Sequence, residues 1–176
     1  MSPAGGAAAG KTVAFVARSG TGKTTLLEKL IPELKRRGYR VGALKHDAHR
    51  FEIDHPGKDT YRLAAAGADT TLITSPEKLA LVKKHAASPP VEEIVAAYFA
   101  DVDIILAEGF RRTTLPRIEV HRKERGGHFP GGAGGDPLLV AVASDEEIDA
   151  GVPVFRLDDA AGIADFLEAT FIRRGH

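Results

Sequence analysis

The sequence of 176 residues contains no cysteine. A chain without cysteine forms no disulfide, has no thiolate nucleophile and offers no sulfur ligand to zinc or to an iron–sulfur cluster. The chain also lacks an excess of charge of either sign, because 24 basic residues balance 24 acidic ones. Nucleic-acid-binding proteins usually carry a basic face, and helices that lie on membranes carry a cationic apolar stripe. We therefore expect a cytoplasmic globular protein with neither nucleic acid nor membrane among its partners.

Long apolar segments are absent as well. No run approaches the ~20 apolar residues of a membrane span, and the first ten residues, MSPAGGAAAG, lack the cationic start and apolar core of a secretory signal. We expect residues 1–10 to form a disordered tail and residues 11–176 to form one domain. Residues 125–137 hold six glycines and two prolines without periodicity. We expect a flexible surface loop over 126–136, or alternatively a lid that a partner orders.

Strand and helix patterns alternate along the chain. The apolar, β-branched run at 12–17 predicts a strand buried on both faces, and the leucine stripe that follows predicts a helix ending at Gly38. Further strands are predicted at 39–46, 70–75, 79–84, 102–107, 116–122, 138–144 and 152–157, and further helices at 59–66, from 91 and at 160–172. This alternation predicts a three-layer α/β fold with a mostly parallel sheet flanked by helices.

The segment ARSGTGKTT at 17–25 joins the first strand to the first helix. It matches the phosphate-binding pattern GxxxxGK[ST] except that Ala17 replaces the first glycine, and its position between a strand and a helix is the one that the pattern requires. Backbone N–H groups at such a loop surround phosphates, the lysine reaches the outer phosphates, and the hydroxyl binds Mg²⁺. The predicted nucleotide ligands are Ser19, Gly20, Thr21, Gly22, Lys23, Thr24 and Thr25. A glycine-rich turn with an incidental lysine is the structural alternative.

Magnesium also needs an acidic partner beyond the end of a neighbouring strand. The segment VDIILAEG offers Asp103 and Glu108, which lie at opposite ends of a strand and are therefore ~16 Å apart. Only one of them can reach the nucleotide edge of the sheet. We predict that Glu108 and Thr24 bind the metal ion, and that Glu108 and Lys23 are the catalytic residues at the phosphates. The alternative is that Glu108 is an ordinary surface carboxylate.

The segment from Lys45 to Arg62 gathers polar residues after the second strand. Lys45, His46, Asp59 and Arg62 are predicted to contact an anionic ligand at this edge. Two alternatives remain open. One is a metal site formed by His46, His49 and Asp54, and the other is a solvated loop in which a residue such as Asp59 caps a helix.

The carboxylate of Asp145 directly follows the strand at 138–144. A carboxylate there can accept hydrogen bonds from N1–H and the exocyclic amine of guanine, whereas adenine offers neither donor. Asp145 is therefore predicted to favour guanine over adenine. Alternatively, Asp145 starts a solvated acidic helix together with Glu146 and Glu147.

Four blocks of the sequence together resemble one known family. They are ARSGTGKTTLLEKLIPELKRRG at 17–38, VGALKHDAHRFEIDHPGKDTYRLAAAGA at 41–68, DIILAEGFR at 103–111 and VAVASD at 140–145. Their order and spacing resemble the molybdopterin-guanine dinucleotide biosynthesis protein B family, called MobB. The family also shares alanine at the first position of the phosphate loop.

The resemblance implies a GTP- and Mg²⁺-binding accessory protein with weak GTPase activity. It implies a role in attaching a guanine nucleotide to molybdopterin, a physical partnership with the MobA-like guanylyl transferase, a homodimer and possible contact with molybdopterin itself. The alternative function is a P-loop phosphotransferase in which Asp47, Asp54 or Arg62 serves an acceptor molecule. We expect slow hydrolysis, because neither a water-positioning glutamine nor an arginine that contacts the transferring phosphate is assigned, although Arg62, Arg111 or a dimer partner could supply the arginine.

Overall fold

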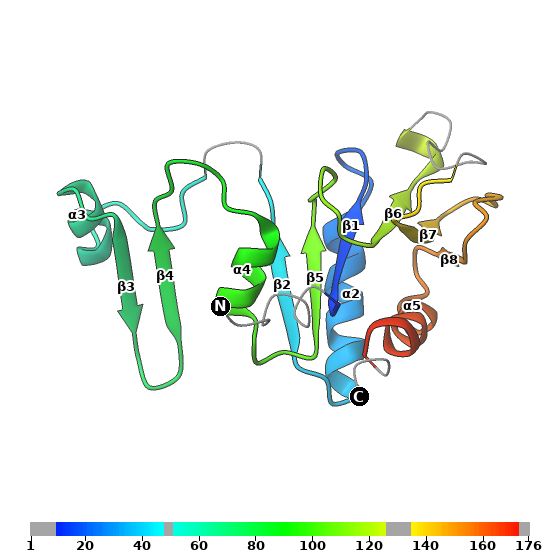
Figure 1. Cartoon of the computed structure of the whole chain (residues 1–176), viewed down its shortest axis with the longest axis horizontal. Helices are drawn as coiled ribbons and strands as arrows, with labels where there is room; N and C mark the ends of the chain where they lie inside the picture. The colour runs from blue at the N-terminus through cyan, green and yellow to red at the C-terminus, as the bar shows by residue number, and fades with distance from the viewer. Residues whose placement is uncertain (1–9, 48–50, 126–134, 173–176) are drawn as a thin grey trace. The chain divides into compact units, whose positions relative to one another are not determined.

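The computed structural model describes residues 10–47, 51–125 and 135–172 (Figure 1). The expected tail, apart from residue 10, and most of the expected loop at 126–136 lie outside these ranges. Contacts divide the chain into two compact units, although a single domain was expected from its length. Unit 1 combines residues 1–46 and 91–176, and unit 2 is the segment 47–90 that lies between them in sequence.

Unit 1 is built on a six-stranded sheet in the order β2-β5-β1-β6-β7-β8. All five pairs of neighbouring strands are parallel, as expected from the alternation of strands and helices. The strands are β1 (Thr12–Val16), β2 (Val41–Lys45), β5 (Ile104–Glu108), β6 (Arg117–His121), β7 (Leu139–Ser144) and β8 (Val154–Arg156). Because all strands run the same way, their carboxyl ends share one edge of the sheet, the upper edge in Figure 1.

The two faces of the sheet have separate cores. Val13 and Phe15 of β1 pack with α2 (Lys23–Arg36) and α5 (Ala160–Leu167), which is continued by a π-helical turn at Glu168–Ile172. Ala14 and Val16, which point to the opposite face, pack with α4 (Val91–Tyr98) and with the connection after β5. The predicted three-layer α/β fold is therefore confirmed.

Helix α2 forms where the leucine stripe predicts it. Its buried residues are Leu26, Leu27, Leu30 and Leu34. Gly38 ends the turn after it with φ 91°, and its N–H donates to the carbonyl oxygen of Lys35 at 3.0 Å.

No helix in the described part of the chain combines the length and the apolar character needed to cross a membrane.

Unit 2 contains one helix and one hairpin. Helix α3 spans Asp59–Ala65, and the antiparallel strands β3 (Thr70–Thr74) and β4 (Leu79–Lys83) form the hairpin. Among its described residues only Thr71 is buried, while Leu72, Ile73 and Leu79 are 51%, 57% and 60% exposed. Unit 2 therefore has no hydrophobic core of its own within the described residues.

Candidate nucleotide-binding site

The loop between β1 and α2 has the backbone conformation that its glycines predict. Gly20 and Gly22 have φ values of 75° and 91°, in the left-handed region that glycine adopts without strain. The buried Thr21 hydroxyl donates to the carbonyl oxygen of Arg18 at 3.0 Å and thereby closes the turn. Gly22 directly precedes α2, so the first N–H groups of that helix, which have no acceptor within the helix, are available to an anion at the loop. Lys23 is folded back toward the same loop, with Nζ 3.4 Å from the carbonyl oxygen of Arg18.

Glu108 lies beside this loop at the carboxyl end of β5, the strand next to β1. Its Oε2 accepts a hydrogen bond from Oγ1 of Thr24 at 2.9 Å, and its side chain is 15% exposed. Asp103 precedes the same strand at the opposite edge, where its carboxylate accepts the backbone N–H of Arg40 at 2.6 Å. The predicted separation of the two carboxylates is therefore confirmed. A hydroxyl and a carboxylate in contact are oxygen donors of the kind that Mg²⁺ prefers, so these residues fit the ion, whose binding stays a prediction.

The end of β2 adjoins Glu108 on the side away from β1. Lys45 Nζ lies 3.9 Å from Oε1 of Glu108, and the backbone N–H of His46 donates to the carbonyl oxygen of Glu108 at 2.9 Å. Gly109 has φ 96°, and a Cβ at this position would lie 3.1 Å from the carbonyl oxygen of His46. The backbones at Gly109 and His46 therefore approach closely. The ring of His46 packs at 5.2 Å from that of Phe110, which is buried although its φ is 51°.

The remaining residues of the predicted anion-binding block belong to unit 2. Arg62 Nη1 lies 3.6 Å from Oδ1 of Asp59, and both side chains are exposed. Lys58 precedes α3 and no side chain caps that helix, so the interpretation of Asp59 as a helix cap is wrong. His49 lies outside the described residues, and within them no group of three or more histidine, aspartate or glutamate side chains is placed to hold a metal ion. Contact of Asp59 and Arg62 with an anion stays a prediction.

Asp145 follows β7 at the edge shared with the phosphate loop. Its Oδ1 accepts the backbone N–H of Lys123 at 2.8 Å, and its Oδ2 lies 3.7 Å from Nη1 of Arg122. No helix forms between β7 and β8, so the alternative of an acidic helix start is wrong. The N–H of Glu146 instead donates to the Ser144 hydroxyl at 3.0 Å, which turns the chain away.

Asp145 also lines a pocket of about 670 Å³ next to the start of α2. The pocket contains carboxylates, arginines and apolar side chains, and it reaches the last glycine of the phosphate loop. Its lining residues are Gly22, Thr25, Leu26, Lys29, Arg122, Ser144, Asp145, Glu146, Glu147, Ile148, Val154, Phe155, Arg156, Leu157 and Asp158. The structure therefore brings the predicted base-reading carboxylate and the predicted phosphate loop to one cavity.

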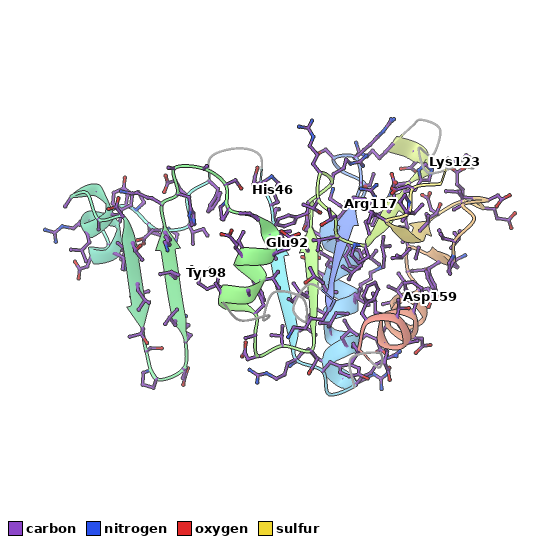
Figure 2. The ribbon with its side chains drawn as sticks, in the orientation of Figure 1. His46, Glu92, Tyr98, Arg117, Lys123 and Asp159 are labelled. Carbon is purple, nitrogen blue, oxygen red and sulfur yellow. The ribbon has the colours of Figure 1, made fainter. Side chains whose placement is uncertain are left out.

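Two arginines that the sequence interpretation did not assign also reach the loop. Arg122 Nε donates to the carbonyl oxygen of Thr21 at 3.3 Å, and the guanidinium carbon of Arg125 lies 3.2 Å from where a Cβ on Gly20 would be. Both follow β6, and Figure 2 shows the neighbouring Lys123 at the same upper edge as His46. The signal in the sequence is the basic run HRKER at 121–125, which begins within the strand predicted at 116–122, but the sequence does not show that this strand lies next to β1.

Arg111, one of the arginines considered for a role at the phosphates, is near a carboxylate instead. Its Nη2 lies 3.9 Å from Oε1 of Glu119 on β6. Burial raises the pKa of the Glu119 carboxyl, and Arg111 opposes that rise. On the same strand, Arg117 donates to Asp136 at 2.8 Å and holds the pKa of Asp136 below its usual range. These contacts form charge pairs beside the site.

Comparison with known proteins gives consistent matches over most of the chain. Residues 12–145 match the family model described as Molybdopterin guanine dinucleotide synthesis protein B. The chain is 41% identical over 169 residues to the molybdopterin-guanine dinucleotide biosynthesis adapter protein of Escherichia coli K12, covering 90% of this chain and 94% of that protein. It is 33% identical over 151 residues to the protein of the same name from Haemophilus influenzae, covering 85% and 83%. A crystal structure of molybdopterin-guanine biosynthesis protein B aligns with a TM-score of 0.69 at 29% identity, covering 90% of this chain and 98% of that one.

Proposed function

Since the chain belongs to the molybdopterin guanine dinucleotide synthesis protein B (MobB) family, we propose that it is a cytoplasmic GTP-binding adapter in the biosynthesis of molybdopterin guanine dinucleotide. The single observation that carries the nucleotide part is the contact between Thr24 and Glu108 at 2.9 Å beside the phosphate loop. An incidental glycine-rich turn does not require a carboxylate from a neighbouring strand at this hydroxyl. A magnesium nucleotide site does, because the ion needs oxygen donors close to the phosphates.

Each part of the site has a separate task in binding. The N–H groups from Gly20 to Thr25 surround the phosphates, and the Lys23 ammonium neutralises the outer ones. Thr24 and Glu108 would hold Mg²⁺, which when bound supplies positive charge to the phosphate oxygens. The ammonium of Lys45 lies 3.9 Å from Glu108 and partly offsets the negative charge of this carboxylate before the ion binds.

Asp145 is the basis of the proposed preference for guanine. One of its oxygens accepts the N–H of Lys123, which fixes the orientation of the carboxylate at the pocket. A fixed carboxylate discriminates well, because guanine offers it two further donors and adenine offers none, a difference of about 1–3 kcal/mol. We infer that this group pairs with N1–H and the exocyclic amine of guanine.

Hydrolysis by the protein alone is proposed to be slow. The sequence contains no glutamine, the residue that orients the attacking water in many P-loop GTPases. Such a protein is suited to present GTP rather than to consume it. We propose that it acts with the MobA-like guanylyl transferase, and that molybdopterin lies close to the shared site when the two proteins meet.

A homodimer is part of the same proposal. In the hairpin β3–β4, the side chains of Leu72, Ile73 and Leu79 are each more than half exposed. Leu72 and Ile73 are consecutive in β3, so the exposed apolar side chains lie on both faces of the hairpin. Two-stranded hairpins are marginal in water unless another element covers them. We propose that a second copy of the chain covers the hairpin, because every copy is made together with others of the same sequence.

Competition binding tests the proposal. GTP and ATP compete for the wild-type protein and for Asp145→Asn, in which the amide oxygen can still accept the Lys123 N–H while the charge is lost. We expect the wild type to prefer GTP by about tenfold or more and the variant to lose most of that preference. Equal affinity of the wild type for both nucleotides would refute guanine recognition. Co-purification with the transferase, followed by mass spectrometry of any bound pterin, tests the adapter role.

A further inference from the structure

The segment after β6 is fixed to the site at two points. Lys123–Arg125 forms a short 3₁₀-helix in which the Arg125 N–H donates to the Arg122 carbonyl oxygen at 3.0 Å. Arg122 Nε holds the carbonyl oxygen of Thr21, and Asp145 holds the N–H of Lys123. The position of Arg125 is therefore set by contacts to both the phosphate loop and the end of β7.

The guanidinium of Arg125 faces the tip of the phosphate loop. Its Cζ, Nη2 and Nε lie 3.2, 3.4 and 3.5 Å from the place of a Cβ on Gly20. Within the described residues no carboxylate lies within ion-pair distance of it. Most other described arginines of unit 1 contact a carboxylate, among them Arg37, Arg40 and Arg156. Among the residues that the structure describes, no carboxylate therefore neutralises the charge that Arg125 holds at the loop.

The lining of the pocket separates the cavity proposed for the base from Arg125. Gly22, Arg122 and Asp145 line the cavity proposed for the base, whereas Gly20 and Arg125 do not. Arg125 therefore lies at a part of the loop outside that cavity, where the outer phosphates of a nucleotide with its base in the cavity would extend. We propose that Arg125 binds the outermost phosphate of the triphosphate, so that the protein distinguishes GTP from GDP; this inference rests on the proposed function.

The chemistry of the guanidinium suits this task. Its planar set of N–H donors matches phosphate oxygens and stays charged at any physiological pH. GDP lacks the group that this arginine would contact, so the contact adds affinity for one nucleotide only. Because the chain contains no glutamine to orient water, an arginine at this position acts in binding rather than in rapid hydrolysis.

Calorimetric titration with GDP and with the nonhydrolysable analogue GppNHp, both with Mg²⁺, tests the inference. The proteins are the wild type, Arg125→Ala, Arg125→Lys and the control Arg36→Ala, which removes the same charge from the far end of α2. Arg125→Ala should lose about tenfold or more in affinity for GppNHp and less than about threefold for GDP. Arg125→Lys should fall between, and Arg36→Ala should match the wild type.

The outcomes separate this inference from the function on which it rests. Equal loss for both nucleotides in Arg125→Ala would assign the residue to the structure of the loop and overturn the inference, as would unchanged affinity for both. Either result leaves the proposed GTP site intact. A wild-type protein that binds neither nucleotide would overturn the proposed function and this inference with it.

Discussion

At the scale of single residues, the phosphate loop combines strain-free glycines with one lysine that has no carboxylate partner within the described residues. Lys23→Ala removes the ammonium that would neutralise the outer phosphates. We expect it to abolish detectable binding of Mg²⁺–GTP in calorimetry while the thermal unfolding midpoint stays within about 2 °C of the wild type. Lys35→Ala, at the far end of the same helix, is the control. Unchanged affinity in Lys23→Ala would refute the assignment of the loop.

Glu108 and Asp103 provide a matched pair of carboxylates associated with one strand. Glu108→Gln should weaken Mg²⁺-dependent GTP binding at least about tenfold, because the neutral amide at Thr24 is a poorer partner for a divalent ion. Asp103→Asn should leave nucleotide binding unchanged, since Asp103 contacts Arg40 at the opposite edge. Titrations with and without Mg²⁺ measure both effects. Equal losses in the two variants would contradict the proposed metal position.

Residue-scale prediction from the sequence succeeded where a local pattern fixed the geometry. The loop glycines and the opposed positions of Asp103 and Glu108 follow from the order of strand, turn and helix. Arg122 and Arg125 were missed for a different reason. Their approach to the loop depends on β6 lying beside β1, which is a long-range pairing that periodicity does not encode.

At the scale of elements, Arg37 joins the end of α2 to α5. Its guanidinium contacts Asp165 at 2.6 Å, Glu168 at 3.1 Å and the carbonyl oxygen of Ala161 at 3.1 Å, and its side chain is 17% exposed. Arg37→Ala should lower the free energy of unfolding by about 1–3 kcal/mol, because several charged hydrogen bonds are lost together. Arg36→Ala, whose exposed side chain contacts Glu33 alone among the described carboxylates, should cause a smaller loss.

The dependence of this effect on pH follows from Glu33. Hydrogen bonds from Arg36 and Arg37 lower the pKa of Glu33 from 4.5 to about 2. A lowered pKa in the folded state stabilises the fold at any pH above the pKa that Glu33 has in the unfolded chain. That contribution is lost as the pH falls from about 4.5 through about 2. The difference in denaturant midpoint between the wild type and Arg37→Ala should therefore shrink over this range. A difference that is constant with pH would show that Arg37 does not act through Glu33.

The elements themselves were largely predictable, and the differences have local causes. The strand predicted at 152–157 is shorter, at Val154–Arg156, because it pairs with β7 only over those residues at the edge of the sheet. The helix predicted over 160–172 widens to a π-helical turn after Leu167. The acidic run after β7 contains helix-favouring residues, but the Ser144 hydroxyl captures the N–H of Glu146 and the chain turns instead.

At the scale of the whole molecule, unit 2 presents apolar side chains that nothing within its described residues buries. If a second copy covers the hairpin, replacing Ile73 and Leu79 by lysine should convert a dimer into a monomer in sedimentation equilibrium. The physical reason is that burying a lysine ammonium without a partner is unfavourable by several kcal/mol. Glu77→Lys in the hairpin turn should leave the dimer intact. A double variant that sediments as the wild type does would place the dimer contact elsewhere.

The position of β5 in the sheet has a consequence for how the protein is made. β5 pairs with both β1 and β2, yet it is translated only after the whole of unit 2. A nascent chain that ends before residue 104 therefore holds β1, α2 and β2 without the strand that joins them, and the leucines of α2 lack much of the core that buries them. Non-local parallel pairing of this kind slows folding and prolongs exposure to aggregation. Unit 1 consequently completes its central sheet late in synthesis, when β5 and β6 leave the ribosome and flank β1, and a chaperone that shields apolar helices is most useful to this protein before that moment.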